Sequence, residues 1–170
     1  MYRKIEDSFM KNAFAKISES DKGYIAGIID GEETITIIKT NCYKDMLSSK
    51  YYINIGVENT SFIMIDFLKR MLGGTFTTLK RNSTKTYYFW GLSARQAYFF
   101  LLEIKDYLKT KRGQAIIALK LYERILNYKY KNNQNKGRIK MGEIELSKRE
   151  ELHKKMQLLN HRGEAICSKT

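Results

Sequence analysis

Residues 24–33 read Tyr-Ile-Ala-Gly-Ile-Ile-Asp-Gly-Glu-Glu and are the most informative segment of this chain. Their apolar and small residues predict a buried helix, and Gly31 permits the tight backbone turn that ends one. Asp30, Glu32 and Glu33 gather at the carboxyl end of that helix. The helix dipole is negative there, so acids are unfavourable unless a cation binds. A hard divalent metal with oxygen ligands is the natural candidate.

Two alternating segments follow this helix and predict a β-hairpin. Residues 34–40 and 51–58 both place apolar side chains at every second position, and a polar loop, residues 41–49, joins them. This period of two is typical of strands with one buried face. The opposite, open face would carry Thr34, Thr36, Thr40, Tyr52 and Asn54.

The next elements repeat this order. Thr60 or Ser61 caps a helix that runs to about Leu72, and Gly73 and Gly74 end it. Residues 75–80 and 85–91 predict a second hairpin, but both of its faces carry aromatic or apolar side chains, so its inner face stays unassigned. Two further helices are expected, one beginning after Ser93 and bearing Leu108, the other at residues 114–128.

The two ends of the chain differ in character. Residues 1–19 predict a helical extension, because apolar residues recur at helical spacing from residue 5 to 17. Residues 129–142 contain five basic side chains and no acid, which is typical of a linker or an arm that contacts phosphates. Residues 143–162 predict an amphipathic helix whose apolar stripe docks on the domain.

Together these elements predict an α+β fold with an αββαββα core in a single domain, residues 1–170. The two hairpins can pair into one four-stranded antiparallel sheet. Helices would cover one face, the other face would stay open, and an extra C-terminal helix would follow.

The composition of the chain indicates the class of partner that the protein binds. The 170 residues carry a formal net charge of +13, which suits a polyanion, most often nucleic acid, although a merely basic protein is the alternative. No apolar run approaches the roughly 18 residues of a membrane span. Cys42 and Cys167 lie far apart and predict neither a disulfide scaffold nor a zinc site, so we expect an intracellular protein that is not secreted.

The open face of the predicted sheet suits recognition of double-stranded DNA. Hydroxyls and amides at strand spacing can read base edges in the major groove. Ordinary solvent-facing residues are the alternative, but the charge and the acidic motif favour recognition. The basic candidates for DNA contact are Lys80, Arg81, Lys85, Lys109, Arg112, Lys129, Lys131, Lys136, Arg138 and Lys140.

Residues 25–32 resemble the signature of the LAGLIDADG homing endonucleases, with Glu33 where that signature has glycine. The order of helices and strands is similar over nearly the whole chain. The resemblance implies a saddle-like sheet and a site-specific DNA endonuclease of the intron-homing type. It also implies a phosphodiester hydrolase that uses Mg²⁺ or another divalent cation.

The resemblance also implies roles for individual residues. Glu32 would be the metal-binding acid, and Gly31 would add its backbone carbonyl, while Asp30 would be structural. Lys111 matches a basic active-site residue that could stabilise charge on the phosphate. Glu58 falls near a position that orders water.

One copy of the motif implies a homodimer in which two such helices pack together, with small Ala26 and Gly27 at the interface. Two-fold symmetry predicts a long pseudo-palindromic target. Three alternatives stay open: an RNA intron maturase, a catalytically inactive DNA-binding protein, and an unrelated basic domain. Inactivity would fit Glu33 and the lack of arginine in residues 60–63, where the family has an active-site arginine.

Overall fold

The computed structural model describes residue 14 and residues 16–40, 48–82, 85–131 and 141–161; the side chains of residues 32–33, 81–82 and 129–131 also lie outside the described part. Five helices and four strands form within these ranges. In chain order they are α2 (Glu19–Glu32), β1 (Glu33–Thr40), β2 (Lys50–Asn59), α3 (Phe62–Leu72), β3 (Thr75–Asn82), β4 (Lys85–Ser93), α4 (Ala94–Ile104), α5 (Arg112–Lys131) and α6 (Glu143–Asn160).

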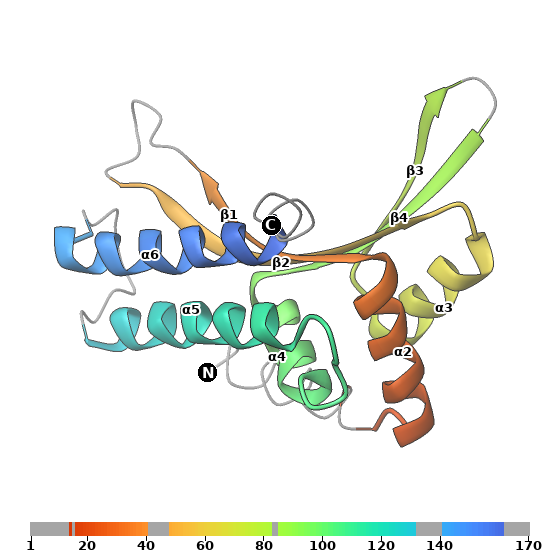
Figure 1. The fold of residues 1–170 in the computed structure, drawn as a ribbon, viewed down its shortest axis with the longest axis horizontal. Coiled ribbons are helices and arrows are strands. Elements are labelled where there is room, and N and C mark those ends of the chain that lie inside the picture. The colour runs from red at the N-terminus through yellow and green to blue at the C-terminus, as the bar shows by residue number, and fades with distance from the viewer. Residues whose placement is uncertain (1–13, 15, 41–47, 83–84, 132–140, 162–170) are drawn as a thin grey trace, which may run out of the picture.

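The four strands form one antiparallel sheet in the order β1-β2-β4-β3. Two hairpins therefore meet through their second strands, β2 and β4. Figure 1 shows the helices below this sheet and the two hairpins rising on either side of its centre. The predicted α+β fold, with helices on one face of an open sheet, is confirmed.

Burial alternates along β2 as the sequence predicted. Tyr51, Ile53, Ile55 and Val57 are buried against the helices, and the residues between them are partly exposed. Burying these side chains removes apolar surface from water, which is the main favourable contribution to folding.

The structure assigns the faces of the second hairpin, which the sequence left open. Trp90 and Leu92 are buried on the helix side, so Tyr87 and Phe89 alternate onto the open face. The Phe89 ring covers two glycines, since a Cβ on Gly56 would lie 2.7 Å from its Cε2 and one on Gly91 would lie 3.0 Å from its Cε1. The hairpin has a register shift between Lys80 and Asn82.

The predicted boundaries of α3 are confirmed. Ser61 is its N-cap, and its side chain accepts a hydrogen bond from the Met64 amide at 3.4 Å. Gly73 follows the last residue with a φ of 70°, a conformation that favours glycine.

The prediction that Leu108 belongs to the helix after Ser93 is wrong. α4 ends at Ile104, and Leu108 lies in the following loop, although it is buried. The loop turns because the Tyr107 amide donates to the Ile104 carbonyl at 2.9 Å and later amides bond to Asp30 on α2. The next helix, α5, begins at Arg112, two residues earlier than predicted.

The docking of α6 on the domain is confirmed. Met156 of its predicted apolar stripe is buried, and the helix lies beside α5 and β1 (Figure 1). Polar bonds add to this contact: Glu150 accepts from Lys39 at 2.7 Å and from the Tyr51 hydroxyl, and Asn160 donates to the Ile35 carbonyl at 3.1 Å.

The predicted N-terminal helix falls mostly outside the described residues, as does most of the basic arm. In the described ranges, no helix is both long enough and apolar enough to cross a membrane.

Candidate active site and nucleic-acid interface

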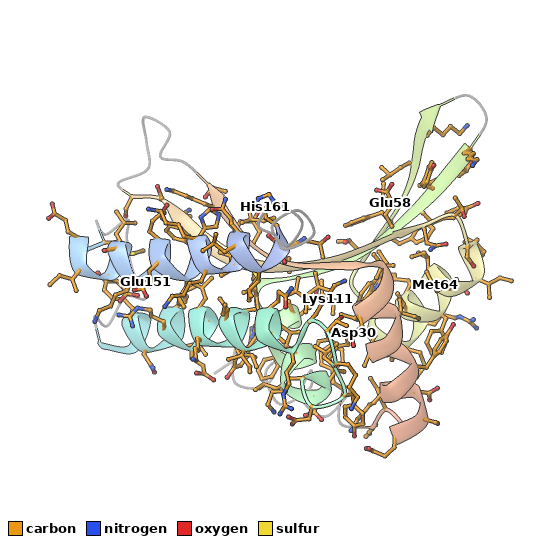
Figure 2. The ribbon with its side chains drawn as sticks, in the orientation of Figure 1. Asp30, Glu58, Met64, Lys111, Glu151 and His161 are labelled. Atoms are coloured by element: carbon orange, nitrogen blue, oxygen red, sulfur yellow. The ribbon has the colours of Figure 1, made fainter. Side chains whose placement is uncertain are left out.

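Asp30, near the carboxyl end of α2, binds the loop that connects α4 with α5. Its carboxylate accepts hydrogen bonds from three successive backbone amides, those of Lys109 at 2.7 Å, Thr110 at 3.2 Å and Lys111 at 2.9 Å. The Thr110 hydroxyl donates to the same carboxylate at 2.9 Å. Figure 2 shows Asp30 and Lys111 next to each other between α2 and α5.

Partial burial acts to raise the pKa of Asp30, but hydrogen bonds from the Lys109 and Lys111 amides and from Thr110 outweigh it and lower the pKa. The carboxylate is therefore ionised, and both of its oxygens already accept bonds from the protein. This geometry agrees with the structural role that the resemblance implied for Asp30.

Lys111 returns the contact from the loop to the helix. Its Nζ donates to the carbonyl of Ile29 at 2.8 Å, and that carbonyl belongs to the last turn of α2. The last turn has no basic residue of its own. An ammonium at this position stabilises the negative end of the helix dipole.

Gly31 and Glu32 are the last two residues of α2. Gly31 is exposed. Apart from its two chain neighbours and the backbone of its own helix, no described atom lies within 4 Å of the place where a Cβ would be. The side chain of Glu32 lies outside the described part, as does that of Glu33.

The last carbonyls of a helix have no partner within the helix, and a carbonyl and a carboxylate are hard oxygen ligands. The donor set of Gly31 and Glu32 therefore fits a divalent cation. Among the side chains that the structure describes, no three His, Cys, Asp or Glu residues come together as a metal site.

Glu58 lies near the end of β2, and the register of the sheet relates it to the motif. Glu33 pairs with Val57, so Glu58 is adjacent to the point where α2 ends and β1 begins. In the view of Figure 2, Glu58 lies above the sheet, whereas Asp30 and Lys111 lie below it. The structure thus brings Lys111 to the helix end directly, and Glu58 only to the neighbouring strand.

The open face of the sheet carries the predicted recognition residues. Thr34, Thr36 and Thr40 alternate with buried Ile35 and Ile37 along β1. Thr36 is paired with Asn54 across the hairpin, so a hydroxyl and an amide stand side by side. Tyr52 lies on the same face of β2 as Asn54, by alternation with its buried neighbours.

The second hairpin divides the predicted basic residues. Lys85 shares the alternation of Tyr87 and Phe89 and therefore belongs to the open face. Lys80 is exposed, but it follows Phe76 and Thr78 onto the face that Trp90 shares. Lys80 lies on that face because it is two residues after Thr78 and comes before the register shift.

Sequence reasoning missed Thr77, Tyr87 and Phe89 as open-face residues. Thr77 and Phe89 are paired, and Leu79 pairs with Tyr87 on the same face. The signal that could have found them is Trp90, because the largest apolar side chain of a strand usually faces the core.

Lys109 and Arg112 are exposed at the α4–α5 loop, and the Arg112 guanidinium donates to Asp106 at 2.9 Å. The remaining basic candidates cannot be placed: the side chains of Arg81, Lys129 and Lys131, and the whole of residues 136, 138 and 140, lie outside the described part.

The exposed face of α2 differs from the one predicted. Ala26 is only 1% exposed and packs inside this chain's own core, because it shares a helix side with Ile25 and Ile29. Gly27 is exposed and lies four residues from both Gly23 and Gly31. Apart from chain neighbours and the backbone of α2 itself, a Cβ on any of these three glycines would have no neighbour within 4 Å among the described residues.

No family model matches the chain, and no curated protein sequence matches it. Solved structures do match it.

The structure of the homing endonuclease I-CvuI, in complex with an I-CreI target, aligns with a TM-score of 0.64 and 19% identity over 83% of this chain and 82% of its own. The archaeal intron-encoded homing endonuclease I-Vdi141I, complexed with DNA, aligns with a TM-score of 0.55 and 15% identity over 82% of this chain and 98% of its own. The LAGLIDADG homing endonuclease I-GzeII, in complex with a DNA target, aligns with a TM-score of 0.56 and 9% identity over 80% of this chain and 43% of its own.

The open antiparallel sheet and its motif helix therefore give this chain the fold of the homing endonucleases. I-GzeII, which shares this fold, is a LAGLIDADG homing endonuclease, the type whose signature residues 25–32 resemble.

Proposed function

We propose that this protein is a site-specific endonuclease that hydrolyses double-stranded DNA, of the intron-homing type. The observation that carries the proposal is the junction of α2 and β1. Gly31 and Glu32 end the motif helix where the first strand of the open sheet begins, and the Lys111 ammonium binds that same helix end at 2.8 Å. The proposed catalytic residues at the end of α2 therefore lie next to the proposed recognition surface of the sheet.

DNA binding is supported by charge and by the open face. A net charge of +13 favours a polyanion, and the paired Thr36 and Asn54 present hydrogen-bonding groups for base edges. I-CvuI and I-GzeII, which share the fold, were each solved in complex with DNA.

Glu32 and the Gly31 carbonyl would hold Mg²⁺ or another divalent cation. The bound cation would supply charge neutralisation at the phosphate and a more acidic water. Lys111 would stabilise the negative charge that develops on the phosphate, since an ammonium in a fixed position needs no rearrangement during the reaction. Glu58 would orient water from the adjacent strand. I-CvuI complexes were solved in the presence of Mg and of Ca.

A homodimer would complete the site, with one Glu32 from each copy. The exposed face of α2 supports this, because Gly23, Gly27 and Gly31 would let a second helix approach closely. Exposed glycines in a helix each cost about 1 kcal/mol relative to alanine, so an open glycine face is explained better by a partner helix than by solvent. The symmetric dimer would recognise a pseudo-palindromic target.

One observation favours a second candidate, a DNA- or intron-RNA-binding protein without cleavage activity. In residues 60–63 no basic side chain is present, and the Ser61 side chain is used as the N-cap of α3. No basic side chain in this segment therefore takes the place of the arginine that the family has there.

Cleavage of a duplex that spans the intron-free insertion site of the host gene tests the proposal. We expect metal-dependent, staggered scission at one position, no scission with chelator, and no scission by Glu32→Gln, which should still bind the duplex. Glu143→Gln, an exposed acid on α6, is the control and should cut like the wild type.

Undiminished cleavage by Glu32→Gln would show that Glu32 does not bind the metal. Specific binding without scission would select the inactive DNA-binding protein. Tighter binding of the intron RNA than of the duplex would select the maturase.

A further inference from the structure

We infer that Asp30 is a positioning residue for DNA cleavage, which acts by holding the Lys111 ammonium at the carboxyl end of the motif helix. The inference rests on the proposed function, in which Lys111 stabilises charge on the phosphate. It assigns Asp30 a part in the reaction without contact with DNA or metal.

The first step is the geometry of the loop. Three consecutive amides, those of Lys109, Thr110 and Lys111, all point at one carboxylate that lies about 80 residues earlier in the chain. Consecutive amides that converge in this way form a concave anion site. The Asp30 carboxylate fills it and fixes the backbone of the loop.

The second step is that Lys111 is attached to α2 at both of its ends. Its backbone amide donates to Asp30 Oδ1 at 2.9 Å, and its Nζ donates to the Ile29 carbonyl at 2.8 Å. A lysine side chain loses rotamer entropy when it is fixed. Here folding has already fixed it, so this cost does not fall on the reaction.

The third step concerns the two carboxylate oxygens of Asp30. Asp30 Oδ2 accepts from the Lys109 amide, and Oδ1 accepts from Thr110 and Lys111. Both oxygens are thus bound to the loop. We infer that the effect of Asp30 on cleavage passes through the loop, which carries Lys111.

A double-mutant cycle on single-turnover cleavage tests this. Asp30→Asn keeps the size of the side chain but turns one acceptor into a donor that opposes an amide. We expect its cleavage rate to fall by about 10- to 100-fold, as for a displaced catalytic group. Because Lys111 is the group that Asp30 positions in this inference, the affinity for the target duplex, measured with Ca²⁺, should stay within about threefold.

In a Lys111→Met background, Asp30→Asn should lower the rate by less than about threefold, because the group that it positions is gone. The matched control is Asp66→Asn on α3, which makes the same charge change. Within the described residues, the Asp66 carboxylate pairs with Arg70 at 2.9 Å. It should cut like the wild type.

Hydrogen exchange of the free protein gives a readout that needs no activity. The amides of Thr110 and Lys111 should be protected in the wild type and exchange faster in Asp30→Asn. Should that variant not fold, Thr110→Val replaces it, because it removes the hydroxyl bond to Asp30 and keeps the backbone amides.

Losses that add fully in the Lys111→Met background would show a general structural role and overturn the inference. Unchanged hydrogen exchange at the Thr110 and Lys111 amides would overturn the inference that Asp30 fixes the loop. A wild-type protein that cuts no duplex overturns the proposed function first, and the two failures are thereby distinguished.

Discussion

Ile55 is fully buried at the centre of the sheet, where it pairs with Ile35 on β1 and with Leu92 on β4. Its side chain is thus surrounded by the residues that join the two hairpins. A cavity at this point would remove contacts from both halves of the sheet at once.

We therefore expect Ile55→Ala to lower the free energy of unfolding by about 2–5 kcal/mol, measured by urea denaturation. Ile63→Ala is the matched control, because Ile63 is 79% exposed and its truncation should change stability by less than about 0.5 kcal/mol. Equal losses for the two variants would contradict the assignment of the core.

Asp30 and Glu32 show why residue type alone does not assign a role. The two acids are two positions apart in the motif, and both lie in the last turn of α2. Asp30 is bound by amides of a loop that is distant in sequence, and only the folded chain brings that loop to it. Glu32, at the helix end, stays the proposed metal ligand.

At the scale of elements, α6 holds the first hairpin from the helix side. Glu150 of α6 accepts from Lys39 of β1 and from Tyr51 of β2, and the His153 ring lies edge-on to Tyr51. β1 carries the predicted recognition threonines on its other face. The contacts of α6 therefore help to fix the position of β1 and of the threonines that it carries.

The bond to Lys39, and then that to Tyr51, hold the pKa of Glu150 below its ordinary value. Because the folded pKa is lowered, the charge of Glu150 stabilises the fold above its ordinary pKa of about 4.3 and loses this effect as the pH falls through the lowered value.

We expect the difference in unfolding free energy between the wild type and Glu150→Gln to shrink as the pH falls from about 7 to about 3. Urea denaturation at each pH measures it. Glu151→Gln, whose partner Lys155 is on the same helix, should change stability by only a few tenths of a kcal/mol at neutral pH. A pH-independent difference for Glu150→Gln would contradict the role of its charge.

At the scale of the whole molecule, one chain presents half of the proposed symmetric surface. The exposed face of α2 carries Gly23, Gly27 and Gly31, with Tyr24 55% exposed beside them. A second copy packed there would bring the two motif helices and their acidic ends together.

We expect Gly27→Leu to weaken self-association by at least about tenfold while the monomer stays folded, because a bulky side chain would separate helices that pack on glycine. Sedimentation at several protein concentrations measures this. Ser147→Leu, an exposed position on α6, is the control and should associate like the wild type. A Gly27→Leu protein with unchanged association would place the interface elsewhere.

Local patterns in the chain were sufficient to predict most of the helices and strands and the four-stranded sheet. The alternation of Ile53, Ile55 and Val57, the cap at Ser61 and the stop at Gly73 each depend on neighbours within a few residues, so they are readable without a structure. The motif of residues 25–32 likewise predicted the fold through its resemblance to the LAGLIDADG type.

Contacts between distant residues required the folded chain. The burial of Ala26, the end of α4 before Leu108 and the open-face position of Phe89 depend on which elements pack together. So does the bond of Asp30 to a loop about 80 residues away. Periodicity fixes which side of an element is apolar, whereas the partner of each polar group is set only when tertiary packing brings the two together.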